Sequence, residues 1–277
     1  MRKGALSFAI VTEVDNAIGA GQLWESIKLA EHLESAANDV LLVILGRTPD
    51  SLMSAASECL VPIRCKEFED LPQVLAARSV QVLVTNLRRI SKLQVDTLRN
   101  MCSLLVCIDE LGGRFIEPDI IVNNSIVGEY HDYKESKAKI FAGPQYISIG
   151  REYQAFNRQL RNFSGAKNVI VSMGGTNPSQ STLRIVEALH TSNSETKINV
   201  VAGSGFEFVE NLESLIQTNY AKIQLHKGLN SIAHLLAGAD VGITVGGNTL
   251  YELACVGTPA IVLYEEAHER KQAETFS

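Results

Sequence analysis

The sequence lacks several features that would each point to a particular class of protein. It has no apolar stretch long enough to span a bilayer, and its densest basic spots are only the pairs Arg88-Arg89 and Arg270-Lys271. Because the net charge is −6, a broad nucleic-acid-binding surface is excluded. None of the five cysteines forms a CxxC pair, and the histidines show no spacing typical of a zinc site. We therefore expect a reduced, cytoplasmic protein with no metal, no cofactor and no nucleic-acid partner.

The two ends of the sequence are each interpreted from their residues. The first residues, MRKGALSFAIVTEVD, begin with basic side chains, but their apolar run is short and an acidic residue soon follows. They predict a first β-strand rather than a signal peptide. The last predicted helix runs into Ser277, which fits either a short natural chain or a cut one.

Short apolar runs rich in Val, Ile and Leu alternate with longer amphipathic stretches along the whole chain. With 277 residues and 45% hydrophobic content, two domains are the natural expectation. Continuous apolar strands separated by helices are typical of parallel sheets covered on both faces. In the first half the predicted strands are 6–12, 40–45, 80–85, 104–108 and 120–122, and the predicted helices are 22–35, 51–57, 71–78 and 92–101.

The alternation is interrupted over residues 146–164, which we interpret as a connector with a polar helix-like stretch at 151–161, and it then restarts. The predicted strands of the second half are 168–173, 198–202, 223–225, 241–245 and 260–263, and the predicted helices are 179–190, 206–218, 231–236, 250–255 and 267 onward. Two successive Rossmann-like domains, 1–150 and 165–277, with parallel sheets facing across a cleft, make the GT-B architecture. The C-terminus of the second domain would be either naturally short or truncated.

Three glycine-rich turns stand where ligands bind in such sheets, beyond the carboxyl ends of strands. The first contains Gly19 and Gly21, and a tight turn explains it as well as a ligand does. The second contains Gly174, Gly175 and Thr176, which could face a diphosphate or simply lead into a helix.

The third turn carries the strongest signal. Gly246 and Gly247 follow a predicted strand, and Asn248 and Thr249 stand at the start of the next helix, whose free N–H groups suit a phosphate. Glu252 follows on the first turn, where its carboxylate could accept hydrogen bonds from both ribose hydroxyls. The alternative is that Glu252 completes a capping box with Thr249.

Two further positions are open to more than one interpretation. His226 follows a predicted strand, in a segment that could present backbone groups to a base or could only be solvated. Asp109 and Glu110 stand at the end of another predicted strand. Paired carboxylates at such a position can act in acid–base catalysis, or they can only cap the neighbouring element and contact solvent.

These motifs, in this order, resemble the nucleotide-sugar hydrolase of pseudaminic acid biosynthesis and a wider group that includes spore-coat polysaccharide proteins and the peptidoglycan N-acetylglucosaminyltransferase. The resemblance spans essentially the whole chain. It is carried by IGAGQLWESIKLAEHL, GPQYISIGREYQAF, VIVSMGGTNPSQSTLRIVEAL and ADVGITVGGNTLYELACVGTPAIVL. It implies that the second half holds UDP, at 174–176, 246–249 and Glu252, and that the first half holds the sugar and supplies the reacting groups.

The sequence departs from this family at two positions in the first half. The family's glycine turn ends in a histidine that assists attack by water, and here that position is Gln22, whose amide cannot take a proton near neutral pH. The family also tends to place an acidic residue after the fourth strand, where this chain has Asn86. We therefore assign Gln22 and Asp109 to catalysis, and Gly19, Gly21 and Asn86 to sugar binding.

Two functions remain open from the sequence. The first is an enzyme of surface-polysaccharide biosynthesis that cleaves the anomeric C–O bond of a UDP-sugar, as a hydrolase or a glycosyltransferase. The second is a non-catalytic relative that only binds a nucleotide sugar. A dinucleotide oxidoreductase is disfavoured, because Trp24 occupies the last glycine place of GxGxxG and the next strand ends in Gly46-Arg47 without a ribose-binding acid.

Overall fold

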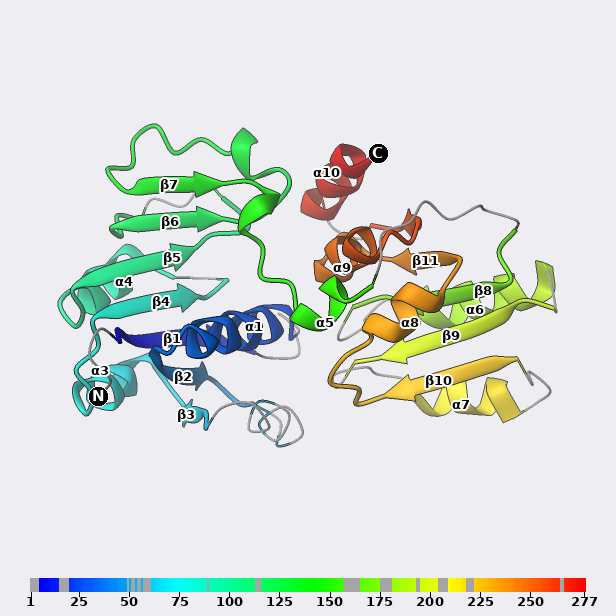
Figure 1. Cartoon of the computed structure of the whole chain (residues 1–277), viewed down its shortest axis with the longest axis horizontal. Helices are drawn as coiled ribbons and strands as arrows, with labels where there is room; N and C mark the ends of the chain where they lie inside the picture. The colour runs from blue at the N-terminus through cyan, green and yellow to red at the C-terminus, as the bar shows by residue number, and fades with distance from the viewer. Residues whose placement is uncertain are drawn as a thin grey trace. The chain divides into compact units, whose positions relative to one another are not determined.

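A computed structural model of the chain describes residues 5–14, 20–48, 50, 53, 56, 61–88, 90–112, 116–156, 165–174, 181–192, 195–203, 209–217, 222–264 and 267–277. The chain divides into two compact units, Met1–Ser148 and Ile149–Thr275. Each unit has its own parallel sheet with helices on both faces (Figure 1). The predicted α/β class with two parallel sheets is confirmed.

The first unit is built on a parallel sheet of seven described strands in the order β3-β2-β1-β4-β5-β6-β7. The first strand lies in the interior of the sheet, and later strands add outward on both sides of it, as in a doubly wound fold. The strands are β1 (Ser7–Glu13), β2 (Asp39–Leu45), β3 (Ile63–Cys65), β4 (Val82–Asn86), β5 (Leu104–Ile108), β6 (Ile120–Asn123) and β7 (Lys139–Ala142).

Helices cover the two faces of this sheet. Helix α1 (Gly21–Ser35) packs on one face, with Leu23 and Ile27 against Ile10 of β1. Helices α3 (Leu71–Ala76) and α4 (Lys92–Arg99) pack on the other face. Because side chains alternate along a strand, neighbouring residues of each strand serve different faces. We call these the α1 face and the α3/α4 face.

The second unit is built on a parallel sheet of five described strands in the order β10-β9-β8-β11-β12. The strands are β8 (Asn168–Ser172), β9 (Lys197–Ala202), β10 (Ile223–Lys227), β11 (Val241–Thr244) and β12 (Ala260–Val262). Helices α6 (Ser181–Ser192) and α7 (Val209–Gln217) pack on one face. Helices α5 (Arg151–Gln154), α8 (Ala233–Gly238) and α9 (Asn248–Val256) pack on the other. Helix α10 (Ala267–Phe276) is the last element.

The stretch that we interpret from the sequence as a connector contributes to a core. Ile149, Tyr153 and Phe156 pack with α8 and α9, and Tyr153 is only 2% exposed. Helix α5 ends at Gln154, and residues 157–161 of the expected polar helix lie outside the described part of the chain.

The sequence misses two strands of the first sheet, β3 and β7. Both are edge strands of three or four residues, and both mix apolar with charged side chains, so they lack the long apolar run that marks the inner strands. The expected helix at 51–57 lies largely outside the described residues.

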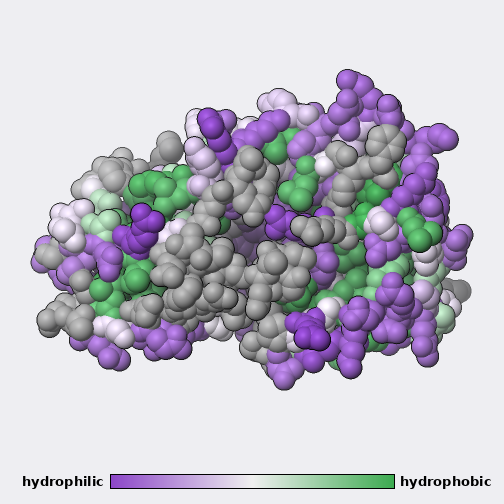
Figure 2. Space-filling view, turned by 180° about the vertical axis from the view of Figure 1, so that it is seen from behind, coloured by the Kyte–Doolittle hydropathy of each residue, from purple (hydrophilic) through white to green (hydrophobic). Residues whose placement is uncertain are grey.

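Figure 2 shows hydrophilic side chains over much of the coloured surface on one side of the molecule, with hydrophobic ones in separate, smaller areas. Among the large apolar side chains that the structure describes, Val61 is the most exposed, at 90%. Within the described residues, no helix has both the length and the apolar character needed to cross a membrane.

Candidate functional site

The predicted glycine turn of the second unit leads directly from β11 into α9. Helix α9 begins at Asn248, with Gly247 as its extended N-cap residue (φ −98°, ψ −161°), and no side chain caps it. The first N–H groups of a helix have no partner within the helix, so an uncapped start suits an anion. Because the N-cap residue is Gly247, Thr249 does not occupy the position that a capping box with Glu252 requires, so this one alternative explanation of Glu252 is wrong.

The two glycines of this turn have different surroundings. A Cβ atom on Gly246 would lie 2.9 Å from the Cα, Cβ and backbone oxygen of Glu269 in α10, so this glycine is required by the close approach of that helix. A Cβ atom on Gly247 would meet no heavy atom within 4 Å. The open space at the start of α9 therefore lies beside Gly247.

Glu252 lies in the first turns of α9 and is 7% exposed. The hydroxyl of Tyr153, from α5, donates a hydrogen bond to its carboxylate. Burial, and then the negative charge of Glu252, raise the pKa of the Tyr153 hydroxyl above its usual range. Tyr153 therefore stays protonated as a donor and fixes the position of the carboxylate.

The predicted second glycine turn lies near the third. Strand β8 pairs with β11, and a Cβ atom on Gly174 would lie 3.7 Å from a methyl group of Val245. Gly174 has φ +81°, a conformation that L side chains rarely adopt. The predicted binding residues Gly175 and Thr176 lie outside the described residues.

The side chain of His226 takes part in a network along the sheet. Its Nε2 atom lies 3.0 Å from Oδ1 of Asn199, whose amide donates to Asn168 at 2.7 Å. Burial, and then the nearby His234 and Lys197, lower the pKa of His226. Asn199 stands opposite Gln224, two residues before His226, so the ring is held back from the carboxyl end of β10. A role for the backbone of this segment stays a prediction.

In the first unit the structure brings Gln22 and Asn86 together. Gln22 lies on the first turn of α1, and Asn86 is the last residue of β4. The Asn86 amide nitrogen lies 3.3 Å from the backbone carbonyl oxygen of Gln22, to which it donates a hydrogen bond. Gly21 begins the helix and is exposed, while the predicted sugar-binding Gly19 lies outside the described residues.

A third residue, Glu25, completes this cluster, and the sequence analysis misses it. Asn86 donates to Glu25 Oε2 at 2.9 Å and also to Ser26 Oγ at 3.2 Å. Asn124, which follows β6, donates to Glu25 Oε1. Burial, and then the negative charge of Glu110, raise the pKa of Glu25 to about 7. The chain thus has a group that can exchange a proton near neutral pH one helical turn beyond Gln22.

The signal for Glu25 is present in the sequence, although its meaning is not. Glu25 lies three residues after Gln22 and within a buried stripe that includes Leu23 and Ile27. A charged residue among buried positions is costly unless it is paired or neutral, and so indicates a special environment. The two amides that surround it come from distant strands, which local sequence cannot reveal.

Asp109 lies on the opposite side of the sheet from this cluster. Along β5, Leu105 and Cys107 belong to the α3/α4 face, and Asp109 continues that alternation. It is fully buried, and the Tyr133 hydroxyl donates to its Oδ2 at 3.1 Å. The structure therefore does not bring Asp109 together with Gln22, whereas the charge of Glu110 acts on Glu25.

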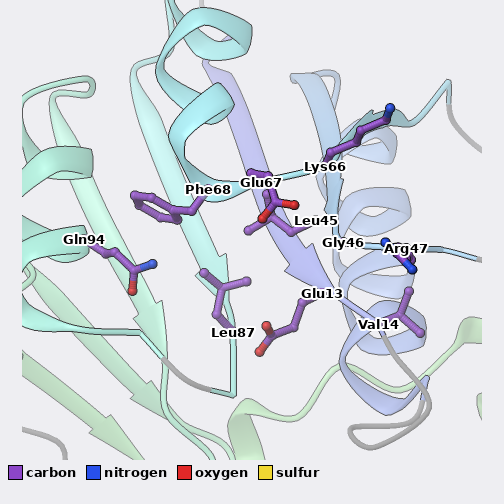
Figure 3. Close-up of a pocket in the computed structure, with 10 residues that line it drawn as sticks. All are labelled: Glu13, Val14, Leu45, Gly46, Arg47, Lys66, Glu67, Phe68, Leu87 and Gln94. Atoms are coloured by element: carbon purple, nitrogen blue, oxygen red, sulfur yellow. The ribbon is translucent and has the colours of Figure 1, made fainter.

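A cavity of about 390 Å³ opens at the carboxyl ends of β1 to β4 (Figure 3). In this view Phe68, Gln94 and Leu87 lie on the left, Arg47 lies on the right, and Glu13 lies between them. Its volume is in the range that small ligands occupy. The lining residues are Glu13, Val14, Leu45, Gly46, Arg47, Lys66, Glu67, Phe68, Leu87 and Gln94.

Metal ligation finds no support among the described residues, because no group of three His, Cys, Asp or Glu side chains could hold an ion there. The cysteines Cys65, Cys102, Cys107 and Cys255 are free thiols.

Comparison with known sequences gives two relatives and no matching family model. The chain is 24% identical to the uncharacterized protein MJ1062 of Methanocaldococcus jannaschii over 277 residues, which covers 96% of this chain and 57% of that protein. It is 27% identical to the spore coat polysaccharide biosynthesis protein SpsG of Bacillus subtilis over 177 residues, covering 62% of this chain and 52% of SpsG. The chain thus spans just over half the length of these relatives.

Comparison with solved structures shows the fold. MurG of Acinetobacter baumannii superposes with a TM-score of 0.61, at 11% identity, over 97% of this chain and 82% of that one. MnaA of S. aureus, solved with UDP, superposes with a TM-score of 0.62, at 11% identity, over 97% of this chain and 82% of that one. The chain has the GT-B fold of these neighbours, as the sequence predicts.

Proposed function

We propose that this chain binds a UDP-sugar and cleaves its anomeric C–O bond with release of UDP, in the biosynthesis of a polysaccharide. The likeness to a spore coat polysaccharide biosynthesis protein supports the pathway class, and the neighbour solved with UDP supports the nucleotide. The diphosphate lies at the start of α9 beside Gly247, the ribose contacts Glu252, and the first unit receives the sugar near Gln22 and Asn86.

The start of α9 carries this proposal. It combines open space at Gly247, a helix N-terminus without a side-chain cap, and a buried carboxylate whose position Tyr153 fixes. A phosphate needs the first two features, and a pair of ribose hydroxyls needs an acceptor such as the third. A turn with only a structural role would require neither the open space nor a buried, oriented carboxylate.

The same features suit the departure of UDP. When the anomeric bond breaks, negative charge develops on the diphosphate oxygen, and the N–H groups and dipole of α9 stabilise it without a proton donor. Attack by water or by an acceptor hydroxyl requires removal of a proton, which the Gln22 amide cannot perform. Glu25 lies near Gln22, but both of its oxygens are occupied by the amides of Asn86 and Asn124, so we assign it no part in removing that proton.

The binding site is tested by two substitutions at Gly247. Asp and Ser are both good N-cap residues, so each should leave the ligand-free melting temperature unchanged or raise it. Asp also places a negative charge where the diphosphate lies. We expect Gly247→Asp to lose the thermal shift that UDP produces in the unsubstituted protein, and Gly247→Ser to retain most of it. If Gly247→Asp binds UDP as tightly as the unsubstituted chain, the diphosphate does not lie at α9.

Turnover is tested separately by release of UDP from a panel of UDP-sugars, with and without alcohol acceptors, and with Gly247→Asp as the blank. Release with water alone identifies a hydrolase, and release that depends on an acceptor identifies a transferase.

The amides at Gln22 and Asn86 favour a second candidate, a relative that binds the nucleotide sugar without cleaving it. Tight binding without any release would support that candidate and reject the first.

A further inference from the structure

The carboxyl group of Glu25 is enclosed by side-chain amides that come from two strand ends. Glu25 is 5% exposed, and each of its oxygens accepts an N–H group, one from Asn86 and one from Asn124. Asn86 and Asn124 are 3% and 5% exposed. Such an arrangement suits an ionised carboxylate, which only accepts hydrogen bonds.

An amide has two different ends, so its orientation depends on what it faces. With Glu25 ionised, the Asn86 nitrogen faces inward to Glu25, Ser26 and the Gln22 carbonyl. Its oxygen is then directed away from this cluster as an acceptor. When the proton is on Oε2, this oxygen becomes an O–H donor, and the Asn86 oxygen can accept from it once the amide has turned over. The amide nitrogen is then directed away as a donor.

We propose that Glu25 is a positioning residue whose protonation state sets which end of the Asn86 amide is presented to a sugar hydroxyl in the first unit. The proton comes from and returns to water, and no other bond changes. The sugar's part in this inference rests on the proposed function, whereas the reorientation of Asn86 is a property of the chain alone.

The charges around Glu25 place the change of state near neutral pH. Burial contributes most to its raised pKa of about 7, and Glu110, which follows β5, raises it further. Lys28, on α1 itself, lowers it, as do the hydrogen bonds from Asn86 and Asn124. Asp109 and Glu13 are directed to the α3/α4 face, where they accept hydrogen bonds from Tyr133 and from the Arg88 N–H group.

The reorientation is tested by nuclear magnetic resonance of the full chain, with the side-chain amide signals of Asn86 followed from about pH 5 to about pH 9. We expect them to shift in one transition near neutral pH. The transition should be absent in Glu25→Gln and present in Glu25→Asp. It should move to lower pH in Glu110→Gln, which removes a negative charge, and to higher pH in Lys28→Gln, which removes a positive one. Signals that stay constant, or that shift equally in Glu25→Gln, would overturn the proposal.

A second readout separates this inference from the proposed function. For any UDP-sugar that the chain turns over, the KM should change with pH through the same transition and should become independent of pH in Glu25→Gln, while the affinity for UDP alone is unchanged. A KM profile that is the same in both proteins would overturn the role of Asn86 toward the sugar. If the chain does not bind UDP, the proposed function is rejected. The resonance experiment then still tests the reorientation of Asn86, because it requires no ligand.

Discussion

At the scale of single residues, the unusual side chains of this protein are buried acids held by neutral donors. Glu25 accepts from two asparagine amides, Asp109 accepts from Tyr133, and Glu252 accepts from Tyr153. A buried carboxylate without such donors would cost several kcal/mol, so the donors determine whether each acid can stay charged. The three acids therefore differ in their hydrogen-bond donors and in the charges around them.

Glu25 makes the stability of the protein depend on pH. In the unfolded chain its pKa is near the ordinary value of 4.5, and in the folded chain it is about 7. Between these values the folded state binds more protons than the unfolded state, so stability falls as the pH rises. We expect the free energy of unfolding of the unsubstituted chain, relative to Glu25→Gln, to fall by about 3 kcal/mol from below pH 4.5 to above pH 7. Denaturant titrations at several pH values measure this, and a constant difference would contradict it.

Tyr153 supports the acid of the second unit. Tyr153→Phe removes the hydroxyl that donates to Glu252 and leaves a buried carboxylate with one donor fewer. We expect a loss of about 1–3 kcal/mol in the free energy of unfolding. In the double variant with Glu252→Gln the loss should be smaller than the sum of the two single losses. Additive losses in that cycle would mean that the two side chains do not depend on each other.

At the scale of helices and strands, the turn between β11 and α9 shows that adjacent glycines can have separate causes. Gly246→Ala would bring a methyl group against the backbone of α10, so we expect a loss of about 1–3 kcal/mol in unfolding free energy. Gly247→Ala has open space and should cost less than about 1 kcal/mol. Equal losses at the two positions, measured by denaturant unfolding, would show that α10 does not pack on the turn.

Local pattern predicts the inner strands of both sheets and the two edge strands of the second sheet, but it misses the two edge strands of the first sheet. The run LLVCI predicts β5 with both its ends, because a strand buried on both faces is apolar throughout. Strands β3 and β7 are short edge strands whose pairing depends on a neighbour already in place. The capping box illustrates the same limit, since it is present at Ser91 and Gln94 of α4 and absent at Thr249 and Glu252 of α9.

Sites assembled from distant segments are recovered only in part. The sequence predicts that Gln22 and Asn86 share a site, and in the structure the Asn86 amide contacts the backbone carbonyl of Gln22, while the site itself stays a prediction. It cannot show that Glu25 lies between Asn86 and Asn124, since 99 residues separate Glu25 from Asn124. Tyr153 lies within the stretch REYQAF that carries the resemblance, but nothing in that stretch indicates that its partner is Glu252.

At the scale of the whole molecule, each unit has its own sheet and its own buried clusters. The proposed nucleotide residues belong to the second unit and the proposed sugar residues to the first. In hydrogen exchange, we expect UDP alone to protect the end of β11 and the start of α9 first, and a UDP-sugar to protect the end of β4 as well. Protection by UDP that begins in the first unit would contradict this division of roles.

The alternation along β5 has one more consequence, for how this edge of the protein can vary. Because Asp109 and Glu110 face opposite sides, removing or adding a single residue in β5 would exchange them, so that Asp109 would lie on the side of Glu25 and Glu110 on the side of Tyr133. Related chains can therefore alter the chemistry at this edge by replacing side chains, whereas a change in the length of β5 would disrupt both faces at once.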